Sequence, residues 1–384
     1  MSVGVIGAGA MGSGIAQVAA SAGENVFLFD ADSASLQRAK NTLLINLQKL
    51  EEKQKIKAGD ATLIFHRIHF ANGLIDFSGC GLVIEAIIED LNIKQKVFIE
   101  LETIVNDECI LATNTSSLSI ASIASACKVS SRVLGVHFFN PAPLMPLVEI
   151  IPTITTSDAI TQSAKARIDS WNKTTVLAKD TPGFIVNRVA RSYYGESIRI
   201  YEEGIADFAT IDWAMKEFGG FRMGPFELMD FIGNDINYKV TESVWQQFFY
   251  EPRFKPSLTQ KRLYEAKLFG KKTGKGYYDY STGGMHAEPN MDNAVGIQIF
   301  ERVIAMLINE AIDSLYLQVA SRDDLDLAMT KGVNYPKGLL QWADSIGLLK
   351  VLTTLQSLYD WYGEDRYRPC ILLKKMVKES KSFY

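Results

Sequence analysis

Two side chains near the middle of the sequence have the types and spacing that proton transfer requires, His137 and Glu149. His137 ends one apolar run, Glu149 lies inside another (146–151), and the proline-rich segment 140–146 between them can reverse the chain. A buried carboxylate beside a histidine orients the ring and stabilises its protonated form, which suits a base that takes the proton of an alcohol. Taken alone, this spacing favours a structural pair slightly over a catalytic one.

The other histidines are weaker candidates for chemistry. His66 and His69 have H-x-x-H spacing, but they lie in a run (64–70) that alternates like a half-exposed strand and offers no acidic ligand. We therefore expect solvent-facing histidines and no metal site. His286 lies in a Ser-, Gly- and Pro-rich segment (281–290) that is typical of an exposed linker.

A glycine-rich turn at the N-terminus predicts a dinucleotide site. The apolar run 3–6 leads into Gly-Ala-Gly-Ala-Met-Gly (7–12) and then into a helix-forming segment. Gly7 permits the tight turn, Gly9 lets the backbone approach a pyrophosphate, and Gly12 allows close packing of helix on strand. Asp30 ends the next apolar run, where a carboxylate can bind ribose hydroxyls and repel a 2′-phosphate. The pattern favours NAD over NADP, and the cofactor-binding residues expected in the turn are Gly7, Gly9, Ala10, Met11 and Gly12.

Two further segments carry polar side chains but have ordinary alternatives. Asn-Thr-Ser-Ser (114–117) follows an apolar run, and its serines also suit a helix N-cap. The segment 180–188, which contains Asn187, could likewise be an interdomain turn followed by a helix. Taken alone, both segments favour the structural interpretation over a functional one.

The elements that must position these residues form an α/β domain. Short apolar runs at 3–6, 25–29, 81–85, 109–113 and 132–136 alternate with helical segments such as 12–22 and the long Lys-rich stretch 33–57. Strands that are apolar on both faces and separated by helices predict a parallel, doubly wound sheet of the Rossmann type. After the Lys-Asp-Thr-Pro-Gly segment (179–183), amphipathic helices replace the strands.

The helical part of the sequence is duplicated. A single ungapped shift of 114 residues pairs Glu196 with Glu310, Asp212 with Asp326, and Ile-Gly at 232–233 with Ile-Gly at 346–347. Matched glycines and aspartates at one offset indicate an internal repeat. We therefore predict three domains: a Rossmann domain (1–183), an all-α domain (184–281) and a second, degenerate all-α copy (294–384).

The composition indicates which class of protein this is and in which cellular compartment it is expected. The formal charge is −4 with 47% hydrophobic residues, which fits a soluble protein and gives no basic excess for binding nucleic acid. No apolar run is long enough to cross a bilayer, and no cleavable leader precedes the first strand, so we expect no membrane partner. The four cysteines are scattered without C-x-x-C pairs, as in a reducing compartment. We expect a cytoplasmic protein, with a processed organellar enzyme as the lesser possibility.

The sequence resembles the L-3-hydroxyacyl-CoA dehydrogenase (3-hydroxybutyryl-CoA dehydrogenase) family along nearly its whole length. The runs that carry the resemblance are GAGAMGSGIAQ from Gly7, VIEAIIED from Val83, NTSSL from Asn114, HFFNP from His137, DTPGFIVNR from Asp180, MGPFELMDFIG from Met223 and FGKKTGKGYY from Phe269. Their order and spacing together are highly specific. The fold that the resemblance implies is a Rossmann domain followed by helical domains, with the second helical copy packing rather than catalysing.

The resemblance also implies a role for individual residues. His137 would be the general base and Glu149 its partner, and Ser116 and Asn187 would hydrogen-bond the substrate oxygen at the reacting carbon. The residues that would join the glycine turn and Asp30 around NAD are Glu89, Lys94, Ser116, Asn140 and Lys272. Lys53 matches a lysine that contacts CoA, and Asn46, where the family often has a serine, would lie nearby together with Ser116. That departure leaves the exact CoA contacts open.

The implied reaction is the reversible, NAD-dependent oxidation of an (S)-3-hydroxyacyl-CoA, most simply a short-chain one of fatty acid β-oxidation, to the 3-oxoacyl-CoA. Two alternatives stay open: an L-gulonate 3-dehydrogenase related to λ-crystallin, and a non-catalytic NAD-binding protein of the same fold. A 6-phosphogluconate-type dehydrogenase would use a catalytic lysine at the domain boundary, where this chain offers His137 instead. Single-copy relatives form homodimers, so the duplication suggests a monomeric pseudo-dimer, with a homodimer as the alternative. Acyl-chain length, pathway and preferred direction stay open.

Overall fold

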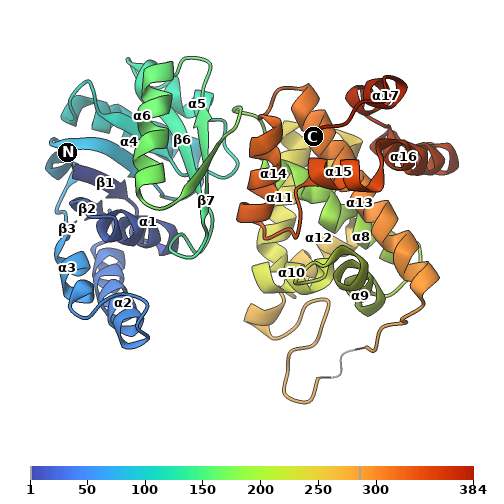
Figure 1. Cartoon of the computed structure of the whole chain (residues 1–384). Coiled ribbons are helices and arrows are strands. Elements are labelled where there is room, and N and C mark those ends of the chain that lie inside the picture. Colours follow the sequence, from blue (N-terminus) through green and yellow to red (C-terminus); the bar gives the residue numbers. More distant parts are fainter. Residues whose placement is uncertain (1, 285–286) are drawn as a thin grey trace. The chain divides into compact units, whose positions relative to one another are not determined.

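The N-terminal half of the chain is built on one twisted sheet. The computed structural model describes residues 2–284 and 287–384, and it divides into two compact units, one ending at Thr181 and the other beginning at Pro182 (Figure 1). His286, expected in a linker, lies outside the described residues. The strands of the first unit are β1 (Ser2–Ile6), β2 (Val26–Phe29), β3 (Ile68–Phe70), β4 (Cys80–Glu85), β5 (Ile110–Thr113), β6 (Val133–Phe138), β7 (Leu147–Pro152) and β8 (Thr174–Leu177).

The order of the strands confirms the predicted doubly wound topology. The sheet runs β3-β2-β1-β4-β5-β6-β7-β8, and only the β6–β7 pair is antiparallel. The order reverses at β1, so the carboxyl ends of β1 and β4 flank the crevice where open α/β sheets bind ligands. β8 was not predicted.

Helices cover both faces of this sheet and bury it in two apolar cores (Figure 1). One core joins the strands to buried residues of α1, α2, α3 and α6, and the other joins them to residues of α4 and α5. The helices are α1 (Ala10–Ser21), α2 (Ser33–Glu52), α3 (Asp60–His66), α4 (Leu91–Ile104), α5 (Ile120–Ala124) and α6 (Asp158–Ser170). Short 3-10 helices are η1 (Leu74–Phe77) and η2 (Ser130–Arg132).

The prediction of an alternating strand over residues 64–70 is wrong in its first half. α3 ends at His66, and only Ile68–Phe70 pair with β2. Ala61 and Ile64 are buried at helical spacing, and so short an apolar run fits either period. His66 and His69 are both exposed, as expected.

The second unit is helical and contains both copies of the repeat. The first copy comprises α7 (Val186–Val189), α8 (Arg191–Glu202), α9 (Phe208–Gly219), α10 (Pro225–Ile232), α11 (Asn234–Gln247), η3 (Pro252–Phe254), α12 (Leu258–Glu265) and η4 (Lys271–Thr273). The second comprises α13 (Asn293–Tyr316), α14 (Arg322–Gly332), α15 (Leu339–Ile346), α16 (Leu348–Tyr362), η5 (Asp365–Tyr367) and α17 (Ile371–Lys378). Shifted by 114 residues, α10 coincides with α15 at both ends, so the duplication is structural as well as sequential.

Each helical copy contains a buried aspartate at the equivalent position, and both aspartates accept the same set of hydrogen bonds. Asp212 accepts hydrogen bonds from the N–H groups of Phe226 and Glu227 and from the Tyr278 hydroxyl. Asp326 accepts the same three, from the N–H groups of residues 340 and 341 and from the hydroxyl of the C-terminal Tyr384. The second copy therefore keeps a counterpart of the tyrosine that follows the F-G-K-K-T-G run, although it lacks the run itself.

Candidate active site

The glycine turn after β1 has the geometry that a pyrophosphate site needs. Gly7 has φ +98°, and a Cβ there would lie 2.5 Å from the carbonyl oxygen of Ala86. A Cβ on Gly12 would lie 1.7 Å from the Gly7 oxygen, so both positions require glycine. A Cβ on Gly9, in contrast, would meet nothing within 4 Å, which leaves the backbone open to a ligand.

The start of α1 can receive negative charge. The N-cap is Gly9, which supplies no side-chain hydrogen bond, and the first turn, which includes Ala10 and Met11, contains no acidic residue. The first N–H groups of a helix carry partial positive charge and need acceptors. The residues present thus fit the pyrophosphate of a dinucleotide.

Asp30 lies at the carboxyl end of β2 and supports this turn directly. Its Oδ2 accepts a hydrogen bond from the N–H of Ala8 at 2.7 Å, and its Oδ1 accepts one from the N–H of Asp32. The carboxylate is therefore held beside the glycine turn.

A buried charge network connects the loops after β4 and β5. The ammonium group of Lys94 is 1% exposed and lies 2.6 Å from Glu85 Oε1 and 3.3 Å from Glu89 Oε2. Glu89 accepts hydrogen bonds from the Thr115 hydroxyl and from the N–H of Ser116. Burial alone raises the pKa of Glu89, but Lys94 and these hydrogen bonds outweigh it and lower the pKa below its ordinary value.

The structure thus brings together three residues predicted around NAD: Glu89, Lys94 and Ser116. Sequence reasoning missed the two groups that hold them, Glu85 and Thr115. An acid ending a buried strand, followed nine residues later by a lysine on an amphipathic helix, is the signal that could have revealed the pair.

His137 and Glu149 form a direct hydrogen bond. They are opposite each other in the antiparallel β6–β7 pair, and His137 Nδ1 lies 2.7 Å from Glu149 Oε2. His137 is 5% exposed and Glu149 is fully buried, so the hydrogen bond between them is shielded from solvent. The Asn114 Oδ1 accepts a hydrogen bond from the N–H of Phe138, which ties the end of β6 to the end of β5 beside Ser116.

Two adjoining hollows of the first unit are lined by the predicted ligand contacts Asn46, Lys53 and Asn140. One, of about 420 Å³, is lined by Gly9, Ala10, Asn46 and Asn140 among others. The second, of about 670 Å³, shares Asn46 and is lined further by Lys53 and two neighbouring lysines, Lys49 and Lys55. Asn46 and Lys53 therefore line one cationic groove that continues from the glycine turn.

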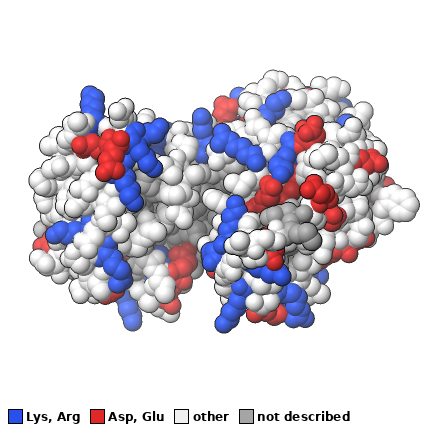
Figure 2. Space-filling view, turned by 90° about the horizontal axis from the view of Figure 1, so that it is seen from below, with Lys and Arg blue, Asp and Glu red and all other residues white. Residues whose placement is uncertain are grey.

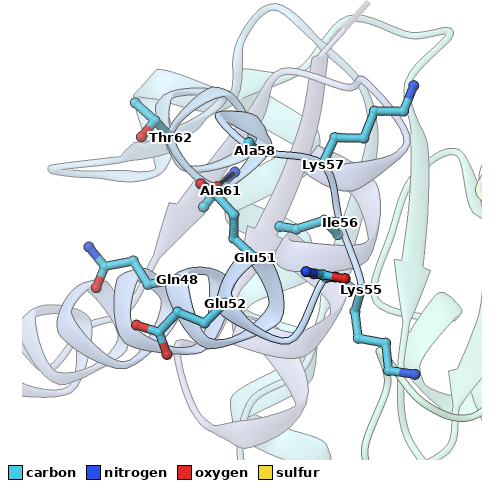
Figure 3. A pocket seen from close by; sticks show the side chains of 10 residues that line it. Gln48, Glu51, Glu52, Lys55, Ile56, Lys57, Ala58, Ala61 and Thr62 are labelled. Atoms are coloured by element: carbon cyan, nitrogen blue, oxygen red, sulfur yellow. Dashed lines mark hydrogen bonds between the residues drawn. The ribbon is translucent and has the colours of Figure 1, made fainter.

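A third hollow, of about 940 Å³, lies between the end of α2 and α3 (Figure 3). It is lined by both Glu51 and Glu52 and by Lys55 and Lys57, and in Figure 3 the two lysine side chains extend away from each other. None of the predicted site residues lines it. On the face seen in Figure 2, acidic and basic side chains are likewise interspersed, so no single sign of charge dominates that face.

Two predicted residues belong to the helical unit. Asn187 is half-buried on α7. Lys272 is exposed and forms an ion pair with Asp235 at 2.6 Å. Among residues 2–284 and 287–384, no group of three or more potential ligands could hold a metal ion, and no helix is long and apolar enough to span a membrane.

Comparison with known proteins identifies the family. The profile of the 3-hydroxyacyl-CoA dehydrogenase NAD binding domain matches residues 2–181, and that of the C-terminal domain matches twice, at 183–280 and 299–382. The chain belongs to the 3-hydroxyacyl-CoA dehydrogenase family. It is an NAD-dependent oxidoreductase that acts on a CH–OH group, and the predicted duplication of the C-terminal domain is confirmed.

Individual relatives agree with this assignment. A 3-hydroxyadipyl-CoA dehydrogenase of Escherichia coli is 35% identical over 97% of this chain and 96% of its own length. The human mitochondrial hydroxyacyl-coenzyme A dehydrogenase is 41% identical over 72% of this chain and 90% of its own. A crystal structure of 3-hydroxybutyryl-CoA dehydrogenase from Escherichia coli has a TM-score of 0.94 at 34% identity and covers 99% of both chains.

Proposed function

We propose that this dehydrogenase reversibly oxidises short-chain (S)-3-hydroxyacyl-CoA thioesters to 3-oxoacyl-CoA, with His137 as the general base and Glu149 as its partner. The hydrogen bond between these two side chains, at the strand end next to Asn114–Ser117, is the observation that carries the proposal. Two relatives have names that refer to short acyl groups, the hydroxybutyryl and the dicarboxylic hydroxyadipyl group.

His137 removes the proton of the substrate hydroxyl. Because Nδ1 is engaged by Glu149, the proton goes to Nε2 of the ring, and the carboxylate stabilises the imidazolium that forms. The glycine turn and Asp30 would hold NAD, which would supply the acceptor for the hydride of C3. In this proposal Ser116 and Asn187 donate hydrogen bonds to the oxygen on C3 and so fix it relative to His137. In the reverse direction the imidazolium returns the proton.

The glycine turn, Asp30, Glu89, Lys94, Asn140 and Lys272 are proposed to hold the dinucleotide. We assign the groove lined by Asn46 and Lys53 to CoA, with Ser116 nearer the thioester end. Lysine side chains around an open groove suit the phosphates of CoA, since cations form charge-assisted hydrogen bonds with phosphate oxygens. Burial lowers the pKa of a further lysine of this groove, Lys173, to about 8, and its ammonium group is held by the carbonyl oxygens of Ala142 and Met145.

The second helical copy is proposed to replace a partner subunit. Arg188 donates to Glu310 at 2.6 Å, and Arg302, its equivalent 114 residues later, donates to Glu196 at 2.6 Å. Each copy thus gives an arginine to the other's glutamate, which is the reciprocal pattern of a two-fold contact. We therefore propose a monomeric pseudo-dimer with domains at 1–183, 184–281 and 294–384. Light scattering that finds a dimer formed through residues 185–280 would contradict it.

The proposed activity is tested by steady-state assays of purified protein. We expect NADH-dependent reduction of acetoacetyl-CoA, much slower reduction with NADPH because of Asp30, and little NAD reduction with L-gulonate. The free, buried state of Cys80, Cys109, Cys127 and Cys370 suits the reducing cytoplasm that we propose as the compartment. Turnover of L-gulonate faster than of 3-hydroxybutyryl-CoA would refute the acyl-CoA assignment.

A further inference from the structure

One buried arginine of the helical unit has no anionic partner. Arg191, the first residue of α8, is 7% exposed, and no carboxylate oxygen of a described residue lies within 4.0 Å of its guanidinium. The other buried arginines in the described ranges all have such a neighbour: Arg132, Arg188, Arg302 and Arg366. Burying a cation without a counter-charge costs free energy of folding. The presence of Arg191 at a buried position therefore indicates that an anion binds there.

The groups around Arg191 are neutral and polar. Its Nε donates to the carbonyl oxygen of Asn187 at 2.9 Å and its Nη1 to the Thr241 hydroxyl at 3.1 Å, while the guanidinium stacks on the ring of Tyr194. Nη2 donates to no described residue. These contacts aim the guanidinium but leave its positive charge uncompensated.

A second polar group near Arg191 also lacks a partner. The hydroxyl of Tyr335 is buried and has no hydrogen-bond partner among the described residues. Burial raises the pKa of this hydroxyl and Tyr194 adds to the rise, whereas nearby Arg191 lowers it. The hydroxyl therefore stays protonated at neutral pH and can donate a hydrogen bond to an anion.

The position of Arg191 relative to Asn187 suggests which anion it binds. Under the function proposed above, Asn187 contacts the oxygen on C3 of the acyl chain. The Arg191 side chain lies against the backbone of Asn187, because its Nε is 2.9 Å from the carbonyl oxygen of Asn187. In a six-carbon dicarboxylic acyl group, three C–C bonds of about 1.5 Å put the terminal carboxyl carbon roughly 4 Å from C3. The terminal carboxylate would thus come within reach of the guanidinium, whereas a monocarboxylic chain would place a methyl group there.

We infer that Arg191, assisted by the Tyr335 hydroxyl, binds the terminal carboxylate of a dicarboxylic 3-hydroxyacyl-CoA and makes this enzyme selective for that substrate class. This inference rests on the proposed function. It assigns specificity to a position four residues after Asn187 and gives the second helical copy, which contains Tyr335, a part in substrate selection.

The test compares two substrates that differ only at the end of the chain, 3-oxoadipyl-CoA and 3-oxohexanoyl-CoA. We expect the wild-type enzyme to prefer 3-oxoadipyl-CoA in kcat/KM by at least about tenfold. Arg191→Met should lower kcat/KM for 3-oxoadipyl-CoA by roughly 10- to 100-fold, the range of a lost charged hydrogen bond, and leave 3-oxohexanoyl-CoA within a few-fold. Arg191→Lys should recover part of the preference, and Tyr335→Phe should reduce it more modestly.

Binding of adipyl-CoA and hexanoyl-CoA, which lack the reacting oxygen, provides a readout independent of catalysis. The wild-type protein should bind adipyl-CoA more tightly, and Arg191→Met should remove that difference. If the wild-type enzyme shows no preference between the dicarboxylic and the monocarboxylic thioester, the inference is overturned. It is also overturned if Arg191→Met lowers kcat/KM equally for both thioesters, because Arg191 would then only support the backbone at Asn187. Failure of the wild-type enzyme to reduce either thioester would instead refute the proposed function.

Discussion

Replacing His137 and Glu149 singly and together tests the catalytic pair most directly. We choose His137→Gln because the amide can still donate to Glu149, which is fully buried, and loss of a hydrogen-bond donor to a buried carboxylate is costly. Removal of a general base lowers rates by about 100-fold or more, so kcat should fall at least that far.

The effect of Glu149→Gln follows from the 2.7 Å hydrogen bond. A hydrogen bond to a charged group contributes about 1.5–3 kcal/mol. Glutamine keeps the shape but not the charge that stabilises the imidazolium formed in the transition state. We therefore expect a loss of roughly 10- to 100-fold in kcat, since about 1.4 kcal/mol corresponds to a factor of ten.

The double variant distinguishes this explanation from two independent effects. If Glu149 acts only through His137, the double variant should be no slower than His137→Gln alone. The assay is NADH consumption with saturating acetoacetyl-CoA, with NADH affinity and thermal unfolding measured on every variant to exclude a folding defect. Multiplicative losses in the double variant, or a kcat for His137→Gln within a few-fold of wild type, would refute the reasoning.

Three further outcomes follow from the geometry. Gly12→Ala should abolish measurable NADH binding by fluorescence or prevent folding, because its Cβ would lie 1.7 Å from the Gly7 oxygen; near-normal NADH affinity would contradict the close packing of α1 on β1. Lys53→Ala should raise KM for acyl-CoA several-fold and make it less salt-dependent with kcat unchanged, whereas Lys57→Ala, which lines the hollow of Figure 3 but not the groove of Lys53, should not. Tyr384→Phe should cost about 1–2 kcal/mol in urea unfolding through its lost hydrogen bond to Asp326, and a large fall in kcat instead would assign the second copy a catalytic role.

Local features of the chain could be predicted because their physical causes are local. Gly7 and Gly12 are required by a positive φ and by a contact with the turn itself, so the fingerprint identified the turn, the helix and the parallel sheet. The single offset of 114 residues likewise revealed the duplication before any packing was known. The strand prediction for residues 64–70 was wrong in its first half because three to four apolar residues fit the helical and the strand period equally well.

The sequence by itself therefore determined the dinucleotide turn, the fold class and the repeated helical half, since each follows from backbone conformation or from periodicity along the chain. Only the tertiary structure decided which distant side chains meet. The antiparallel register of β6 and β7 sets His137 against Glu149, and the buried position of Lys94 joins Glu85 to Glu89. Spacing could not distinguish the paired arginines from Arg191, because pairing depends on which carboxylates the folded helices bring within reach, and burial is what makes a missing partner costly.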